Sequence, residues 1–66
     1  MYMAIIFGWD NVIAFSEDEE KAKKLAIKRK KKSNEDYFPD KWDWNSVTEF
    51  YGANVVKIKE GYVDNF

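Results

Sequence analysis

The chain has 66 residues, a net charge of −1 and 18% aromatic residues, but neither Cys nor His. These absences exclude disulfides and the usual zinc ligand sets, and the charge balance argues against a dedicated nucleic-acid binder. A domain of this size has a small core and often needs oligomerisation to be stable. We therefore expect a single domain over residues 1–66 that self-associates and uses neither a metal nor a cofactor.

Two apolar runs near the N-terminus, residues 2–7 and 12–15, predict a β-hairpin. The four residues between them, Gly8, Trp9, Asp10 and Asn11, are typical of a hairpin loop. The expected register pairs Phe7 with Val12. Both faces of the first strand are then apolar, which is typical of a central strand covered on both sides.

An amphipathic helix is predicted over about residues 17–31. Ser16 and Glu19 have the spacing of a capping box, acids fill the first turn, and cations fill the last turn. Ile27 lies on another side of this helix. The expected apolar stripe is thin and consists of Ala22, Leu25, Ala26 and the stem of Arg29. Such a stripe covers one face of a small sheet and leaves the other face for either the aromatic segment or a second subunit.

The aromatic segment, residues 37–51, ends in a predicted short helix with Asp43 or Ser46 as its cap and Gly52 as its stop. We expect Trp44 and Phe50 in this helix to cover the sheet face that the long helix leaves open. For Tyr37 and Trp42, which lie among charged residues, core and surface positions are both consistent with the sequence.

A third strand is predicted over residues 53–59, with Val56 and Ile58 inward and Lys57 and Lys59 outward, as in an edge strand. Residues 62–63 suggest a further short strand. The predicted fold class is therefore α+β, with a three- or four-stranded antiparallel sheet in ββαβ order. One long helix covers one face of the sheet, and a short aromatic helix accompanies it.

Catalysis is not expected, because the commonest general base and the best thiol nucleophile are both missing. Asp40 and Asp43 flank Trp42, but their spacing in a loop fixes no distance between the carboxylates. We interpret them as solvated acids and predict that the protein is not an enzyme.

The basic run at residues 28–32 has two interpretations. It is either the cationic end of a solvated helix or a patch that binds phosphate. The acids at the start of the same helix favour the first interpretation.

The predicted function is a small binding protein, a homodimer or larger, that holds an anionic, base-containing, nucleotide-like ligand. Aromatic rings would stack on the base and cations would meet the phosphate. The candidate ligand-binding residues are Trp9, Tyr37, Trp42, Lys28, Arg29, Lys57 and Lys59. The alternatives are a protein–protein inhibitor or adaptor that uses the aromatic segment, and a nucleic-acid binder that uses the basic helix end.

No apolar run is long enough to span a membrane, so we expect no membrane partner and a cytoplasmic location. In its small size, its lysine and aromatic content and its lack of catalytic residues, the chain resembles accessory or counter-defence proteins of phages and mobile elements. This resemblance is one of composition and covers no motif.

Overall fold

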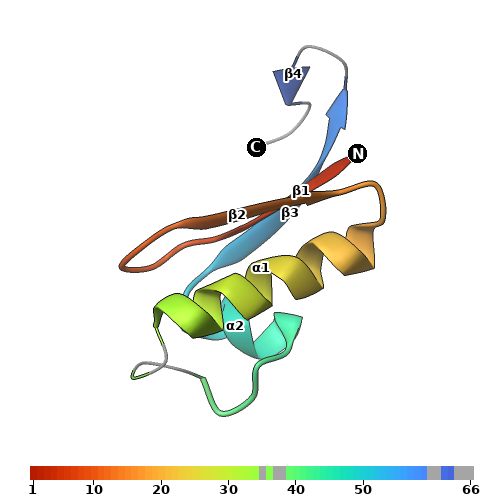
Figure 1. The fold of residues 1–66 in the computed structure, drawn as a ribbon. Coiled ribbons are helices and arrows are strands. Elements are labelled where there is room, and N and C mark those ends of the chain that lie inside the picture. The colour runs from red at the N-terminus through yellow and green to blue at the C-terminus, as the bar shows by residue number, and fades with distance from the viewer. Residues whose placement is uncertain (35, 37–38, 60–61, 64–66) are drawn as a thin grey trace.

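The computed structural model describes residues 1–34, 36, 39–59 and 62–63, without the side chains of residues 59, 62 and 63. Within this part of the chain, two helices pack on a four-stranded antiparallel sheet (Figure 1). The elements are β1 (Tyr2–Ile6), β2 (Val12–Ser16), α1 (Glu19–Ser33), α2 (Trp44–Phe50), β3 (Ala53–Lys59) and β4 (Tyr62–Val63). The predicted α+β class and element order are confirmed.

The central position of β1 is also confirmed. The sheet order is β2-β1-β3-β4, and β1 pairs antiparallel with both of its neighbours. β3 is an edge strand only in part, because β4 pairs with it at Ile58 and Lys59. In the described part of the chain, β2 therefore forms one complete edge of the sheet.

The hairpin register differs by one residue from the expected one. Val12 pairs with Ile6 and not with Phe7, so the connection between β1 and β2 spans residues 7–11. Gly8 in this connection has a φ of +128°, which residues with a Cβ rarely adopt. Because the extra loop residue moves the register by one, Val12 points to the opposite face of β1 from the one predicted.

The face of the sheet toward the helices forms the core. Ala4 and Ile6 of β1 meet two alanines of α1 and Val47 of α2, and all of these side chains have 0% exposure. The small alanines allow α1 to approach the sheet closely. The core cluster consists of Ala4, Ile6, Val12, Ala22, Ala26 and Val47.

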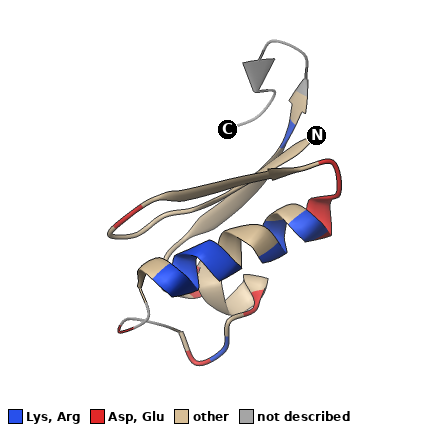
Figure 2. Ribbon diagram, in the orientation of Figure 1, with Lys and Arg blue, Asp and Glu red and all other residues tan. Residues whose placement is uncertain are grey.

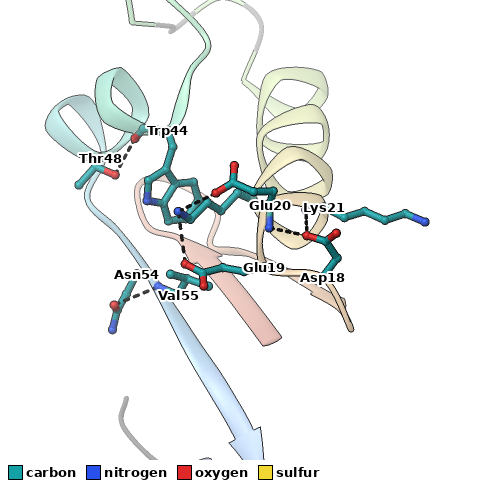
Figure 3. A network of polar contacts seen from close by, with 9 residues as sticks. Asp18, Glu19, Glu20, Lys21, Trp44, Thr48, Asn54 and Val55 are labelled. Carbon is teal, nitrogen blue, oxygen red and sulfur yellow. Dashed lines mark hydrogen bonds and ion pairs between the residues drawn. The ribbon is translucent and has the colours of Figure 1, made fainter. Parts of the chain in front are cut away.

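The long helix begins later than predicted. Its N-cap is Asp18, whose carboxylate accepts hydrogen bonds from the backbone N–H of Glu20 and of Lys21 (Figure 3). Ser16 instead accepts a hydrogen bond from the N–H of Asp18 at 3.2 Å and remains the last residue of β2. The predicted capping box is therefore wrong, because a second capping residue lies closer to the helix.

The buried stripe of α1 also differs from the expected one. Its buried residues are Ala22, Ala26 and Lys30, at successive i, i+4 positions. Leu25 is exposed, whereas Ile27 packs partly buried against the core. The stripe is rotated because α1 contacts α2 as well as the sheet.

The aromatic segment does not cover the second face of the sheet. Both helices lie on the same side of the sheet (Figure 1), and Trp42 and Trp44 pack partly buried against the shared core. Phe50, which we expected in the core, is 53% exposed, and Val47 takes the central buried position of α2. The predicted cap Asp43 is confirmed, and Gly52 follows the helix with a φ of +91°.

Lys23 of α1 contacts both the first turn of its own helix and the start of α2. Its Nζ lies 3.5 Å from a carboxylate oxygen of Glu19 and 3.5 Å from one of Glu20. The same ammonium group lies 5.6 Å from the ring centroid of Trp44, within the range of a cation–π interaction. The side chain of Thr48 donates a hydrogen bond to the carbonyl of Trp44 (Figure 3). Trp44, the first residue of α2, therefore contacts Lys23 through its ring and Thr48 through its backbone.

The face of the sheet away from the helices is apolar. Met3 and Ile5 of β1 and Val56 of β3 lie on it and are at most 5% exposed. Ile13 and Phe15 of β2 pair with Ile5 and Met3, so their side chains share this face, and both are exposed. The most exposed apolar surface of the sheet therefore lies along the edge strand β2.

Loss of the α2 cap provides the first testable prediction. Asp43 accepts a hydrogen bond from the Ser46 N–H at 2.8 Å, and this bond lowers the pKa of the carboxyl group. Asp43→Ala should lower the Tm in thermal denaturation by several degrees, and Asp43→Asn, which keeps an acceptor, should lower it less. Because the pKa is lower in the folded state, the carboxylate stabilises the fold above its unfolded pKa. That stabilisation is lost as pH falls through the folded pKa. A Tm of Asp43→Ala equal to that of wild type at pH 7 would contradict this assignment.

Candidate functional site: the Trp9 loop and the lysine beneath it

The loop between β1 and β2, residues 7–11, presents the most exposed large apolar side chain among the described residues. We call it the Trp9 loop. Trp9 is 78% exposed, as its position beside Asp10 predicts. At the start of the loop, the N–H of Phe7 donates to the carbonyl of Gly52 at 2.9 Å. The loop is thus attached to the segment that connects α2 to β3.

Lys30 in the last turn of α1 lies beneath the Trp9 loop. Its side chain has 0% exposure, which is rare for lysine. Its Nζ donates a hydrogen bond to the carbonyl oxygen of Asp10 at 2.5 Å. The same Nζ lies 4.5 Å from the ring centroid of Tyr51, in cation–π range. One buried cation therefore connects α1, the Trp9 loop and the end of α2.

Burial shifts the titration of both partners in this cluster. Desolvation lowers the pKa of Lys30, and the nearby charge of Asp10 opposes this shift. Desolvation also raises the pKa of the Tyr51 hydroxyl. Both shifts favour the neutral form of the group concerned. The carbonyl dipole and the aromatic face partly replace the water that the ammonium group loses.

Gly8 fits closely into this arrangement. A Cβ built at Gly8 would lie 2.7 Å from Cδ1 of Tyr51 and 2.8 Å from Nζ of Lys30. These distances are shorter than van der Waals contact, so the backbone of the loop approaches Tyr51 and Lys30 as only glycine allows. The position of Trp9, the next residue, is therefore set by packing beneath it.

Tyr51 is in turn supported by the aromatic segment. Its ring lies 6.3 Å from that of Trp42, at a tilt of 32°, and 4.7 Å from that of Phe50 in an edge-to-face arrangement. Such pairs are stabilising beyond their buried area. Trp42 and Phe50 thus pack against Tyr51, and Tyr51 in turn contacts Lys30 beneath the Trp9 loop.

The predicted ligand-binding residues are distributed over separate parts of the molecule. Trp9 and Trp42 both lie near Tyr51, at the same end. Lys28 and Arg29 are exposed on α1 and line a different groove, together with Ile13 and Phe15. Lys57 pairs with Tyr2, at the opposite end of β1 from the Trp9 loop. The side chains of Tyr37 and Lys59 lie outside the described residues. Their ligand-binding roles remain predictions.

Lys30 was not among the sequence-predicted site residues. In the sequence it is one member of a basic run, and nothing in composition separates it from its neighbours. The available signal was spacing, because Ala22, Ala26 and Lys30 lie on one helical face. If that face is placed toward the core, Lys30 is the residue of the basic run that becomes buried.

Three further observations concern the described residues. A shallow pocket of about 250 Å³ beside α2 is lined by Pro39, Asp40, Ser46, Glu49 and Phe50. The described part of the chain contains no group of three or more His, Cys, Asp or Glu side chains placed to hold a metal ion. Among its helices, none combines the length and apolar character needed to cross a membrane.

The fold and site define a small α+β domain that presents a tryptophan on a clamped hairpin loop. Comparisons with protein-family models, curated proteins and solved structures find no significant match. The function is therefore argued from the geometry of the chain itself.

Proposed function

We propose that the protein is a non-enzymatic binding module whose anchor is Trp9, and that it binds a protein partner with an apolar pocket. One observation carries this proposal. Trp9 is 78% exposed on a loop whose backbone is held by Lys30, a side chain with 0% exposure. The loop thus presents an exposed aromatic side chain on a backbone that is held from beneath.

Rigid presentation matters for affinity. Tryptophan is among the residues most enriched at the energetic centres of protein interfaces. Binding also costs the ordering of mobile side chains and loops, and a loop fixed before binding avoids part of that cost. The hydrogen bonds of Lys30 to Asp10 and of Phe7 to Gly52 fix this loop from two directions.

The loop also indicates the chemistry of its partner. Asp10 follows Trp9 and is exposed, and Lys30 donates its hydrogen bond to the carbonyl of Asp10, while the carboxylate interacts with Lys30 through its charge alone. A partner surface that receives the indole in an apolar pocket and places a Lys or Arg beside it would match both residues.

A nucleotide-like ligand is less well supported by this arrangement. Its aromatic and phosphate-binding groups would need to converge, but Lys28 and Arg29 line a groove with β2, and Lys57 lies at the other end of β1. The separation of these groups favours the adaptor or inhibitor function over nucleotide sequestration.

The test compares Trp9→Ala with Phe15→Ala, which changes an exposed aromatic residue of β2 outside the Trp9 loop and the residues that support it. Immobilised wild type and both variants are exposed to a proteome from the source of the chain, and enriched proteins are then purified. A true partner should bind wild type and Phe15→Ala similarly, and bind Trp9→Ala at least about 30-fold more weakly, as expected of an interface hot spot. Thermal denaturation must show that both variants are folded.

Two outcomes would contradict the proposal. One is a purified partner that binds Trp9→Ala as tightly as wild type. The other is a rise in the Tm of wild type with mono-, di- or cyclic nucleotides that disappears in Lys28→Ala/Arg29→Ala. That result would mean that the protein binds a nucleotide in the groove beside β2, which Lys28 and Arg29 line.

A further inference from the structure

A groove runs along the edge strand β2, on a different part of the molecule from the Trp9 loop. Its volume is about 410 Å³. Three of its apolar side chains, Ile13, Phe15 and Leu25, are 46%, 52% and 41% exposed. The full lining is Ile13, Ala14 and Phe15 of β2 with Leu25, Lys28, Arg29 and Lys32 of α1. We call this surface the β2–α1 groove.

We propose that a second copy of this chain occupies the β2–α1 groove and pairs its own β2 with this β2 in antiparallel orientation, forming a twofold-symmetric dimer with one continuous sheet. A twofold axis relates identical surfaces, so two equal strand edges meet antiparallel. With the axis at Ala14, Ile13 of each copy lies opposite Phe15 of the other. The apolar face then continues across the dimer.

The sequence of β2 lacks the usual protection of an edge strand. Exposed edges are normally blunted by lysine, proline or a covering element. β2 reads VIAFS and carries none of the protective residues, while its neighbour on the other side is β1. Pairing with a second copy satisfies the outer backbone groups of β2 and covers its exposed side chains.

The direction of α1 determines how the two helices lie in this dimer. Acids lie at the start of α1 and cations at its end (Figure 2). α1 runs back along β2, since Lys30 in its last turn reaches Asp10 in the loop that precedes β2. The twofold axis at Ala14 therefore places the two α1 helices antiparallel, side by side.

The levels of the charges match in this dimer. Lys28 and Arg29 lie about 14 Å along the helix axis from Glu19. Ala14, on the axis, lies about 7 Å along β2 from the end at which α1 begins. The rotation therefore brings Lys28 and Arg29 of one copy level with the start of α1 in the other, where the N-cap Asp18 lies on the same helical side as Leu25, whereas Glu19 and Glu20 face Lys23. Symmetry forms this contact twice.

The distance between the helices is also suitable. Paired strands lie about 4.8 Å apart, so helices that each cover a β1–β2 pair are about 10 Å apart across the new junction. This is the separation of directly packed helices. Leu25, exposed in the single chain, would then lie between the two helices.

The first experiment measures mass by light scattering and sedimentation equilibrium on the whole chain at micromolar concentrations. Wild type should have twice the monomer mass of 7.9 kDa. Phe15→Lys and Ile13→Lys should give monomers, while Phe50→Lys, a matched change on α2, should remain dimeric. Circular dichroism checks that each variant is folded. A monomeric wild type, or a dimer that persists in both β2 variants, would overturn the proposal.

A charge exchange tests the orientation. Lys28→Glu/Arg29→Glu and Asp18→Lys each place like charges against one another in their own dimers, so each alone should dissociate at least tenfold more readily than wild type. Mixed in equal amounts, the two variants should form a mixed dimer with restored charge pairing. Failure of the mixture to associate more strongly than either variant alone would exclude antiparallel pairing of the helices.

Discussion

Replacing Lys30 by Ala is expected to remove most of the free energy of unfolding of the protein, although the substitution removes a charge from the interior. The lysine stem is fully buried between α1, Gly8 and Tyr51. Its deletion removes several methylene groups and leaves a cavity, which costs about 2–4 kcal/mol. A domain of this size has a total stability of only about 3–5 kcal/mol. Urea denaturation followed by circular dichroism measures the loss.

Lys30→Met is the matched control, because it keeps the buried stem and removes the charge. Replacing a buried ionic group by an apolar one of similar volume is often neutral or stabilising. We expect the free energy of unfolding to change by less than about 1.5 kcal/mol. If Lys30→Met destabilises as much as Lys30→Ala, the hydrogen bond to Asp10, not the packing of the stem, is the main stabilising feature.

The pH dependence of this pair provides a second measurement. The pKa of Lys30 is lowered by burial, so the unfolded chain binds its proton more readily than the folded chain. Wild type should therefore become more stable relative to Lys30→Met as pH rises from below the folded pKa toward 10.5. Tyr51 acts in the opposite direction, since its raised pKa means that stability is lost above pH 10. Tyr51 is present in both proteins, so its effect largely cancels in the comparison.

Lys30→Met also tests whether the hydrogen bond from Lys30 to Asp10 matters for the proposed function. The variant keeps the fold but cannot donate to the carbonyl of Asp10. The Trp9 loop should then be more mobile, and a partner should bind more weakly through a faster dissociation rate. Trp9→Ala removes the anchoring side chain itself. Comparing Trp9→Ala with Lys30→Met therefore distinguishes the contribution of the indole contact from that of the fixed loop.

The sequence predicted the elements of this fold better than their junctions. Strand and helix positions follow from local residue types, which is why β1, α2 and the cap Asp43 were found. The errors at the hairpin and at the start of α1 concern single residues, where two close alternatives compete. Asp18 replaces Ser16 as the cap, and a five-residue loop replaces a four-residue one.

The candidate site was less predictable, because it depends on contacts between distant segments. The sequence placed Trp9 in the hairpin loop, and its side chain is exposed there. Lys30 was missed because its burial requires the simultaneous placement of the Trp9 loop and Tyr51 around it. The second face of the sheet was assigned to the aromatic segment, since sequence does not reveal on which side a connection returns.

Gly8→Ala should be the most disruptive single methyl addition in the Trp9 loop. The φ of +128° is unfavourable for alanine, and such strain alone costs about 1–3 kcal/mol. The new Cβ would also collide with Tyr51 and Lys30, at 2.7 and 2.8 Å. Because Tyr51 is held by Trp42 and Phe50, we expect the lysine and the loop to move, which breaks the hydrogen bond to Asp10. The Tm should fall, and the fluorescence of Trp9 should change.

Gly52→Ala separates these two costs. Its φ of +91° imposes a comparable backbone strain, but its Cβ would meet only Cδ2 of Phe7, at an ordinary 3.7 Å. Gly8→Ala should therefore destabilise the protein more than Gly52→Ala, and the difference measures the close packing of the loop on Tyr51 and Lys30. Equal losses of unfolding free energy in urea denaturation would mean that the Trp9 loop shifts to accommodate the new Cβ at no cost in stability. In that case Lys30 would not hold Trp9 in place, and Trp9 would not be a preorganised anchor.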